Sequence, residues 1–250
     1  MMATPPSPTA TAPAVRPPGA TTGARAPPVA RRAFAAVLTL VAVYAALDVV
    51  AQMLPPHYSA ITQPESDLAV GPYGGIMTLN FVVRGALSLL FLWAFGRTVA
   101  SAGGSWRQYR GGTISLAVWA VGAFVLAAFP TDVPSTPISG HGAVHLVAAI
   151  VAFLGGAIGV YWLSRGFAQT PILRPVQGWA TALGVLSLVL VVLELTGGLF
   201  VPRISDRIGG LLERIFLASV LLWIALVALY LLRASGAFED SSAADRTSRA

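Results

Sequence analysis

Six long apolar segments dominate this chain and limit what it can fold into. Each is about twenty residues long, the length at which a helix crosses the roughly 30 Å hydrocarbon core of a bilayer. Because that core offers no water to unpaired backbone groups, such segments must be helical. The sequence therefore predicts an all-α, polytopic membrane protein, a single bundle of six transmembrane helices over Phe34 to Leu54, Gly75 to Gly96, Gly112 to Phe129, Ala143 to Leu163, Gly178 to Phe200 and Gly209 to Leu232.

The composition supports this fold and leaves no room for a soluble enzyme module. Hydrophobic residues fill 56% of the 250 positions and charged residues 10%, against roughly 25% charged in soluble domains. We expect a disordered Pro-, Ala- and Thr-rich tail over residues 1–32, a transmembrane domain over 33–234 and a disordered tail over 235–250. The chain contains no cysteine, so thiolate chemistry is excluded.

The arginines predict the orientation. All 16 basic residues are Arg, and most lie before the first segment or after the second, fourth and sixth, whereas the opposite connections hold only Arg203 and Arg207. The positive-inside rule then places both termini in the cytoplasm and the first, third and fifth connections outside the plasma membrane. Because these arginines flank the spans, the net charge of +6 indicates no nucleic-acid partner; the expected partner is the lipid bilayer.

Ionisable residues inside the spans mark a candidate site. Such groups cost several kcal/mol unless they are paired or hydrated. At about 1.5 Å rise per residue they lie toward the outer ends of their helices, so we expect an outward-facing polar cavity that binds a small molecule, lipid head group or partner. Alternatively they form structural ion pairs, Arg84 with Asp48 or Glu194 and Arg214 with a carboxylate. The set is Asp48, Arg84, Glu194, Glu213 and Arg214.

A histidine pair suggests a different chemistry. His141 and His145 are four residues apart, so both imidazoles lie on one face if a helix begins near Ser139. With Asp132 they are candidate ligands for zinc, which would activate water while Glu65 or Asp67 acts as general base. The alternative is that the histidines are hydrogen-bonded interfacial residues without a metal.

Glu65 also has a local explanation. The run Thr62, Gln63, Pro64, Glu65 reads as a capping box that opens a short surface helix, which Gly71 and Pro72 would end. In that case the carboxylate of Glu65 serves the backbone rather than catalysis.

Three motifs carry a family resemblance. These are the Glu65, Ser66, Asp67 loop; the Phe129, Pro130, Thr131, Asp132 turn with His141, Gly142 and His145; and the run Gly210 to Ile215. With these motifs the chain resembles, from roughly Val37 to Arg233, the six-span membrane proteins catalogued as domain of unknown function 998. The resemblance implies a plasma-membrane protein and adds no activity. The acidic cluster and histidine pair also look like metal-dependent membrane hydrolases related to ceramidases, although those have seven spans.

Three functions stay open at this point. The first is a membrane protein with an outward polar cavity for a ligand, in which Arg84 and Arg214 hold an anionic group. The second is a metal-dependent hydrolase at the outer leaflet. The third is a proton-coupled transporter that uses Asp48 and Glu194, which would need polar residues continuing toward the cytoplasmic side.

Overall fold

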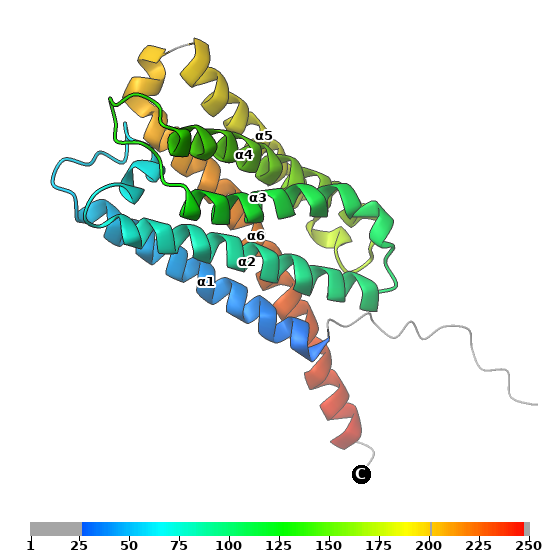
Figure 1. Ribbon diagram of the computed structural model, residues 1–250. Coiled ribbons are helices and arrows are strands. Elements are labelled where there is room, and N and C mark those ends of the chain that lie inside the picture. The colour runs from blue at the N-terminus through cyan, green and yellow to red at the C-terminus, as the bar shows by residue number, and fades with distance from the viewer. Residues whose placement is uncertain (1–26, 201, 248–250) are drawn as a thin grey trace, which may run out of the picture.

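The protein is a bundle of long helices (Figure 1). The computed structural model describes residues 27–200 and 202–247, and that part of the chain holds helices but no strand. Six of the helices are long and apolar enough to cross a membrane, which confirms the predicted fold class. They are α1 (Pro28–Met53), α2 (Gly74–Ser101), α3 (Arg110–Ala128), α4 (Gly140–Gly166), α5 (Gln177–Phe200) and α6 (Pro202–Thr247).

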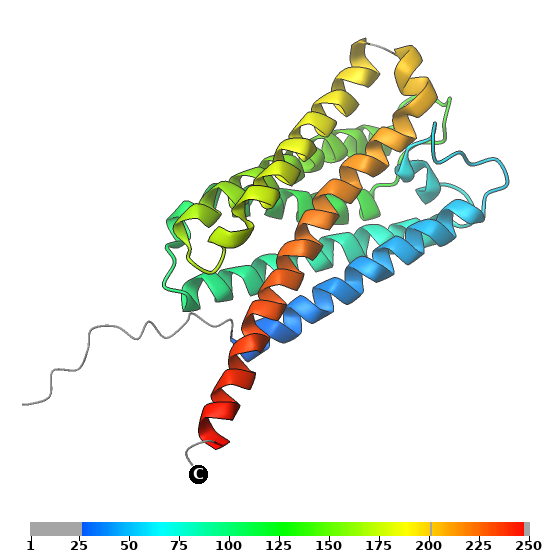
Figure 2. The same ribbon diagram turned by 180° about the vertical axis from the view of Figure 1, so that it is seen from behind.

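The helices form a closed ring in chain order. Each helix packs against the next, and α6 returns to pack against α1. In Figure 2, α6 runs obliquely across the bundle, and α2 and α6 are the most buried of the six spans. We call the end that carries the α1–α2, α3–α4 and α5–α6 connections the site end, and the opposite end, where α1 begins, the terminal end.

α1 and α6 begin several residues before their predicted starts, and α2 and α4 run past their predicted ends. α1 begins at Pro28 rather than Phe34, because proline at the first helical position loses no backbone hydrogen bond. α6 continues to Thr247, through most of the region predicted to be a tail from residue 235. That segment contains several alanines, the residue with the highest helix propensity, and it prolongs a helix that is already formed. Residues 1–26 of the tail that was predicted over residues 1–32 lie outside the described residues.

Glycines bring α3 and α4 into close contact. A Cβ at Gly159 would lie 2.7 Å from the backbone nitrogen of Leu116, and one at Gly112 would lie 2.7 Å from the backbone nitrogen of Leu163. Gly155 would likewise collide with the carbonyl oxygen of Ser115. A side chain at any of these positions would force the helices apart, as in other small-residue seams of membrane proteins.

Aromatic side chains fill the interior toward the terminal end. The rings of Phe91 and Trp223 lie 5.7 Å apart between centroids, those of Phe167 and Trp223 5.9 Å, and those of Phe95 and Tyr109 5.0 Å. All five residues are fully buried. Phe91 and Phe95 follow Arg84 by two and three helical turns on α2, about 10 and 16 Å toward the terminal end. This aromatic cluster separates the terminal half of the bundle from the polar groups described next.

Candidate functional site: a polar cavity at the site end

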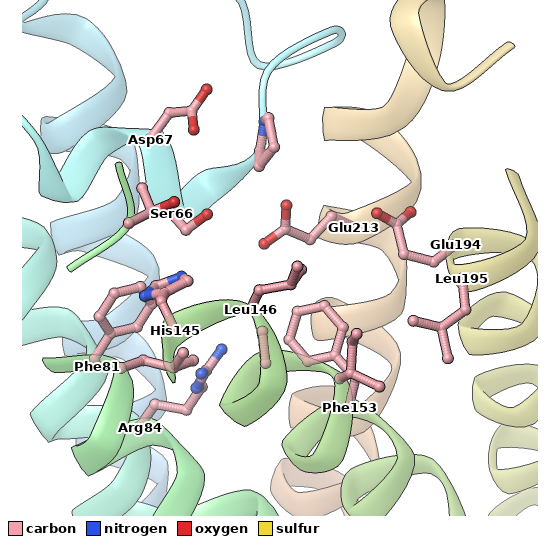
Figure 3. A pocket seen from close by; sticks show the side chains of 15 residues that line it. Ser66, Asp67, Phe81, Arg84, His145, Leu146, Phe153, Glu194, Leu195 and Glu213 are labelled. Carbon is pink, nitrogen blue, oxygen red and sulfur yellow. The ribbon is translucent and has the colours of Figure 1, made fainter. Parts of the chain in front are cut away.

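The site end encloses a cavity of about 440 Å³ (Figure 3). This volume lies within the usual range for small-molecule sites, roughly 300 to 1,000 Å³. Its apolar wall comes from α2 to α5: Phe81, Leu126, Leu146, Ile150, Phe153 and Leu195. Its polar lining comes from α2, α4, α5, α6 and the two connections above them: Ser66, Asp67, Arg84, Thr131, His145, Glu194 and Glu213.

Arg84 is the cation of this cavity. Its side chain is 1% exposed, and its guanidinium carbon lies 4.5 Å from the ring centroid of Trp119 and 5.2 Å from that of Phe81. The backbone of this turn is also held, since Trp119 donates to the hydroxyl of Ser88, which donates to the carbonyl of Arg84. Yet Nε and Nη2 of Arg84 have no hydrogen-bond partner among the described residues. A buried guanidinium with unpaired N–H groups is costly in free energy.

Two carboxylates face the cavity from the other side. In Figure 3, Glu213 from α6 and Glu194 from α5 lie together, across the cavity from Arg84 and His145. Oε2 of Glu194 is buried and has no partner in the described part of the chain, whereas Oε2 of Glu213 accepts from the backbone N–H of Glu65 at 3.1 Å. The cavity therefore lies between a guanidinium and a carboxylate that each keep atoms without a hydrogen-bond partner among the described residues.

His145 lines the cavity on the side of Arg84. Its ring is 4% exposed, and Nδ1 lies 2.7 Å from the carbonyl oxygen of Phe129. Since a carbonyl can only accept, Nδ1 carries the proton, and Nε2 is left as the nitrogen for other contacts.

The α1–α2 connection folds over the site end and is held there by α6. Nη1 of Arg214 donates to the carbonyl oxygens of Ala60, Gln63 and Gly210, each at 3.0 Å, and Nη2 donates to the hydroxyl of Tyr58. The N–H of Leu211 donates to the carbonyl of Ile61 at 3.0 Å. Arg214 therefore anchors a loop, a role for which its five donors in a rigid fork are suited.

The same connection contains a short helix that carries Glu65 into the bundle. This helix, η1 (Glu65–Ala69), is followed by Val70 in an extended conformation and by Gly71 at φ +87°. Gly74, the first residue of α2, packs directly on the backbone of Ala69, and a Cβ there would overlap the carbonyl group of Ala69. The neighbouring Gly75 has open space around its Cβ position. The loop end is thus packed against α2 as well as against α6.

This difference between neighbouring glycines gives a first prediction. Gly74→Ala must push η1 away from α2, so we expect a loss of about 1 to 3 kcal/mol in the free energy of unfolding. Gly75→Ala should instead be neutral or stabilise the start of α2 by up to about 1 kcal/mol. Both are measured as midpoints of thermal or denaturant unfolding in detergent. Equal effects of the two substitutions would show that η1 does not pack on α2 as described.

Glu65 is buried rather than used as a helix cap. It is 1% exposed, and its Oε1 accepts from the hydroxyl of Tyr44 at 2.7 Å and from the amide of Asn80 at 3.4 Å. The capping-box interpretation is wrong, because η1 has no side-chain capping bond and the carboxylate points into the bundle. Burial and the nearby charge of Asp48 raise the pKa of Glu65 from 4.5 to about 7, although Arg84 and the Tyr44 bond oppose the shift.

The raised pKa of Glu65 predicts a pH dependence of stability. Folding favours its protonated form, so the free energy of unfolding should fall as pH rises from 4.5 to about 7 and level off above; the total is about 3 kcal/mol. Glu65→Gln keeps an acceptor for Tyr44 and removes this titration. We expect its thermal midpoint to vary less with pH and to exceed that of the parent at pH 8. A parent-like pH profile in Glu65→Gln would contradict the assignment of this pH dependence to Glu65. Asp67→Asn, on the same short helix, is the comparison variant.

The structure distributes the predicted cavity residues over two places. Arg84, Glu194 and Glu213 line the cavity just described, and Asp67 lines it too. Asp48 and Arg214 instead line a separate groove between α1 and α6. The guanidinium of Arg214 is directed at loop carbonyls, so it is not placed to hold an anionic ligand in the cavity. The suggested ion pair of Arg84 with Asp48 or Glu194 does not form at Nε or Nη2.

The predicted zinc ligands have other partners. Asp132 accepts from the hydroxyl of Ser139 at 2.6 Å and from its backbone N–H at 2.8 Å, and these bonds lower the pKa of Asp132. Ser139 in turn caps α4 through the N–H of Gly142. His141 is exposed with its ring 5.5 Å from that of Phe129. In the described residues no three His, Asp or Glu side chains form a group that could hold a metal ion.

Sequence reasoning missed several residues that shape the site. Tyr58, Phe81 and Phe153 carry no charge and belong to apolar or loop segments, so nothing in the sequence distinguishes them from ordinary packing residues. Asn80 lies one helical turn before Arg84 on α2 and Ser88 one turn after it, and all three are buried.

Comparisons with known proteins agree with the fold and give no activity. The family described as "Protein of unknown function (DUF998)" matches residues 33–230, almost the whole of the helical bundle. No curated protein and no solved structure matches the chain. With more than half of its length covered, the chain belongs to the DUF998 family.

Proposed function

We propose that this protein is a receptor or carrier for a small zwitterionic amphiphile, held in the site-end cavity. The observation that supports this most is the buried, unpartnered guanidinium of Arg84, which needs an anionic group. Across the cavity, the unpartnered Oε2 of Glu194 needs a donor, and an ammonium group supplies one. A purely anionic ligand would meet the carboxylates of Asp67, Glu194 and Glu213, which a zwitterion avoids.

The apolar wall argues for an alkyl chain on the same ligand. Most of the surface that lines the cavity is apolar, although polar side chains line it too. This mixture is typical of sites in which apolar burial contributes affinity and a few polar groups fix orientation. The arginine distribution supports a cavity that faces away from the cytoplasm across the plasma membrane.

The two other functions receive less support. The hydrolase hypothesis needs Asp132, His141 and His145 to converge on one metal ion. Instead, Asp132 is hydrogen-bonded to Ser139, and His145 is hydrogen-bonded to the carbonyl of Phe129. The transporter hypothesis needs polar residues that continue toward the terminal end. The buried polar groups there include the hydroxyls of Thr98, Ser164 and Thr170, and they lie in the part of the bundle that the aromatic cluster fills.

The proposal is tested by titrating the purified protein in maltoside detergent with three probes. Lysophosphatidylethanolamine carries an anionic group, an ammonium and a chain; lysophosphatidylglycerol of the same chain length lacks the ammonium; glycerophosphoethanolamine lacks the chain. We expect the first to bind at least tenfold more tightly than the other two, and Glu194→Gln to reduce its affinity to that of lysophosphatidylglycerol. Equal binding of the two lysolipids would contradict the zwitterion, and equal binding of glycerophosphoethanolamine would identify a soluble ligand rather than an amphiphile.

A further inference from the structure

A second recess lies between α1 and α6, separate from the cavity. This groove has a volume of about 370 Å³ and shares no lining residue with the cavity. Its polar residues are Tyr44, Asp48, Glu65 and Arg214, and the rest of its lining is alanine, valine and leucine. The cavity function proposed above uses none of these residues, so the groove needs its own explanation.

Two carboxylate oxygens in the groove have no hydrogen-bond partner. Asp48 uses Oδ2 to accept from Gln52 at 2.6 Å, and Glu65 uses Oε1 to accept from Tyr44 at 2.7 Å. The second oxygen of each, Oδ1 of Asp48 and Oε2 of Glu65, is buried and unpaired among the described residues. Glu65 is 99% buried, so water from the surroundings does not reach its carboxylate freely. Unpaired carboxylate oxygens in one recess are stabilised by a hydrogen-bond donor, and more strongly by a donor that carries a positive charge.

Arg214 lines the same groove, and its charge interacts with both carboxylates. Its Nη1 and Nη2 donate to the carbonyls of Ala60, Gln63 and Gly210 and to the hydroxyl of Tyr58 instead of to a carboxylate. Oδ1 of Asp48 and Oε2 of Glu65 therefore have no hydrogen-bond donor among the described residues, although a guanidinium lies nearby.

The groove is polar at one end and apolar along its length. Asp48 lies five residues before the end of α1 at Met53, and Arg214 lies near the site end of α6. Leu221 and Ala225 follow Arg214 by seven and eleven residues, which is about 10 and 16 Å farther from the site end. Val49 is 55% exposed and Leu222 48% exposed, so the groove opens on the outer face of the bundle, where lipid chains lie. A molecule with one cationic head and one alkyl chain matches this division.

We propose that the groove between α1 and α6 binds an amphiphile with a protonated amine head group, whose N–H groups donate to Asp48 and Glu65 while its chain lies along Val41, Leu217 and Leu221. An ammonium group has three N–H donors and no acceptor, so it can donate to both unpaired carboxylate oxygens. Small residues on both helices, Ala45 and Ala218 among them, leave the space that the chain occupies.

The test uses dodecylammonium as the probe and the full chain in maltoside detergent. Binding is measured by titration calorimetry beside butylammonium, which lacks the chain, and dodecanol, which lacks the charge. Two kinds of variant separate the head and chain sites. Asp48→Asn removes a charge from a partly exposed residue that accepts a hydrogen bond from Gln52, one helical turn away, so folding should be retained. Ala45→Leu fills the groove, and Ala46→Leu, equally exposed but outside the groove, is its matched control.

We expect dodecylammonium to bind the parent at least tenfold more tightly than either comparison probe. Ala45→Leu and Asp48→Asn should each weaken it at least tenfold, whereas Ala46→Leu should leave it unchanged. The proposal is overturned if Ala45→Leu and Ala46→Leu bind alike, if dodecanol or butylammonium binds as tightly, or if Glu194→Gln in the site-end cavity abolishes binding. Because Glu194→Gln tests the cavity and Ala45→Leu tests the groove, failure of one proposal is distinguishable from failure of the other.

Discussion

Arg84→Gln should weaken binding of lysophosphatidylethanolamine at least 50-fold while the protein stays folded. The variant loses the charge and the two donors, Nε and Nη2, that have no partner among the described residues. Hydrogen bonds to charged groups contribute about 1.5 to 3 kcal/mol each, and about 2.3 kcal/mol corresponds to a 50-fold change in affinity.

The expected effect of Arg84→Gln on stability is small or favourable without ligand. The substitution loses the contacts of the guanidinium with the rings of Trp119 and Phe81. It also removes a charge that is 1% exposed and lacks a hydrogen-bonding partner at two of its nitrogens, which relieves a desolvation cost. A thermal midpoint that stays close to that of the parent, beside a large loss of affinity, would separate a ligand-binding role from a structural one.

Two further variants control this prediction. Arg84→Lys keeps a charge but loses the planar fork, so we expect a loss of about tenfold. Arg97→Gln removes an exposed arginine from the same helix at the terminal end and should leave binding unchanged. If Arg84→Gln binds the probe as tightly as Arg97→Gln, the guanidinium of Arg84 does not hold the anionic group.

Arg214→Gln should have the largest effect on stability, about 3 to 5 kcal/mol in the free energy of unfolding. The substitution leaves the carbonyls of Ala60, Gln63 and Gly210 and the hydroxyl of Tyr58 without the guanidinium donors. Each unsatisfied buried group costs about 1 to 3 kcal/mol, and the losses add incompletely because one side chain serves all of them. The α1–α2 connection should detach before the helices separate.

The detachment can be measured directly. Hydrogen–deuterium exchange should show faster exchange at Leu211, whose N–H donates to the carbonyl of Ile61 on the connection, with little change in α3 and α4. Arg207→Gln is the matched control, because Arg207 lies on the same helix, is exposed and makes none of the loop contacts described above. An equal loss of stability in the two variants would contradict the anchoring role of Arg214.

The sequence predicted the helices because their signal is strong and local. A run of about twenty apolar residues constrains the backbone by itself, and the six predicted ranges overlap the six observed spans. Helix ends were less predictable, since α6 continues through a polar, alanine-rich segment whose hydropathy resembles that of a tail. The position of Glu65 could not be predicted, because burial of a loop carboxylate depends on Tyr44 and Asn80, which lie 21 and 15 residues away.

The site was only partly predictable for a similar reason. Depth in the membrane follows from residue number, so Glu194 and Glu213 could be assigned to one level near the outer boundary and Arg84 to a somewhat deeper one. The direction in which a side chain points within the ring of helices depends on how neighbouring helices pack. In the structure Asp48 lies in the groove beside α6, whereas Glu213 lies in the cavity. The four-residue spacing of His141 and His145 suggested a shared metal, but the same spacing is compatible with one exposed and one buried histidine.

The most direct test of the cavity assignment is a structure of the protein determined with lysophosphatidylethanolamine bound. We expect the phosphate within about 3 Å of Nε or Nη2 of Arg84, the ammonium beside Glu194 and the chain against Phe81, Leu146 and Phe153. A head group located outside the cavity, or a phosphate that contacts no atom of Arg84, would contradict it.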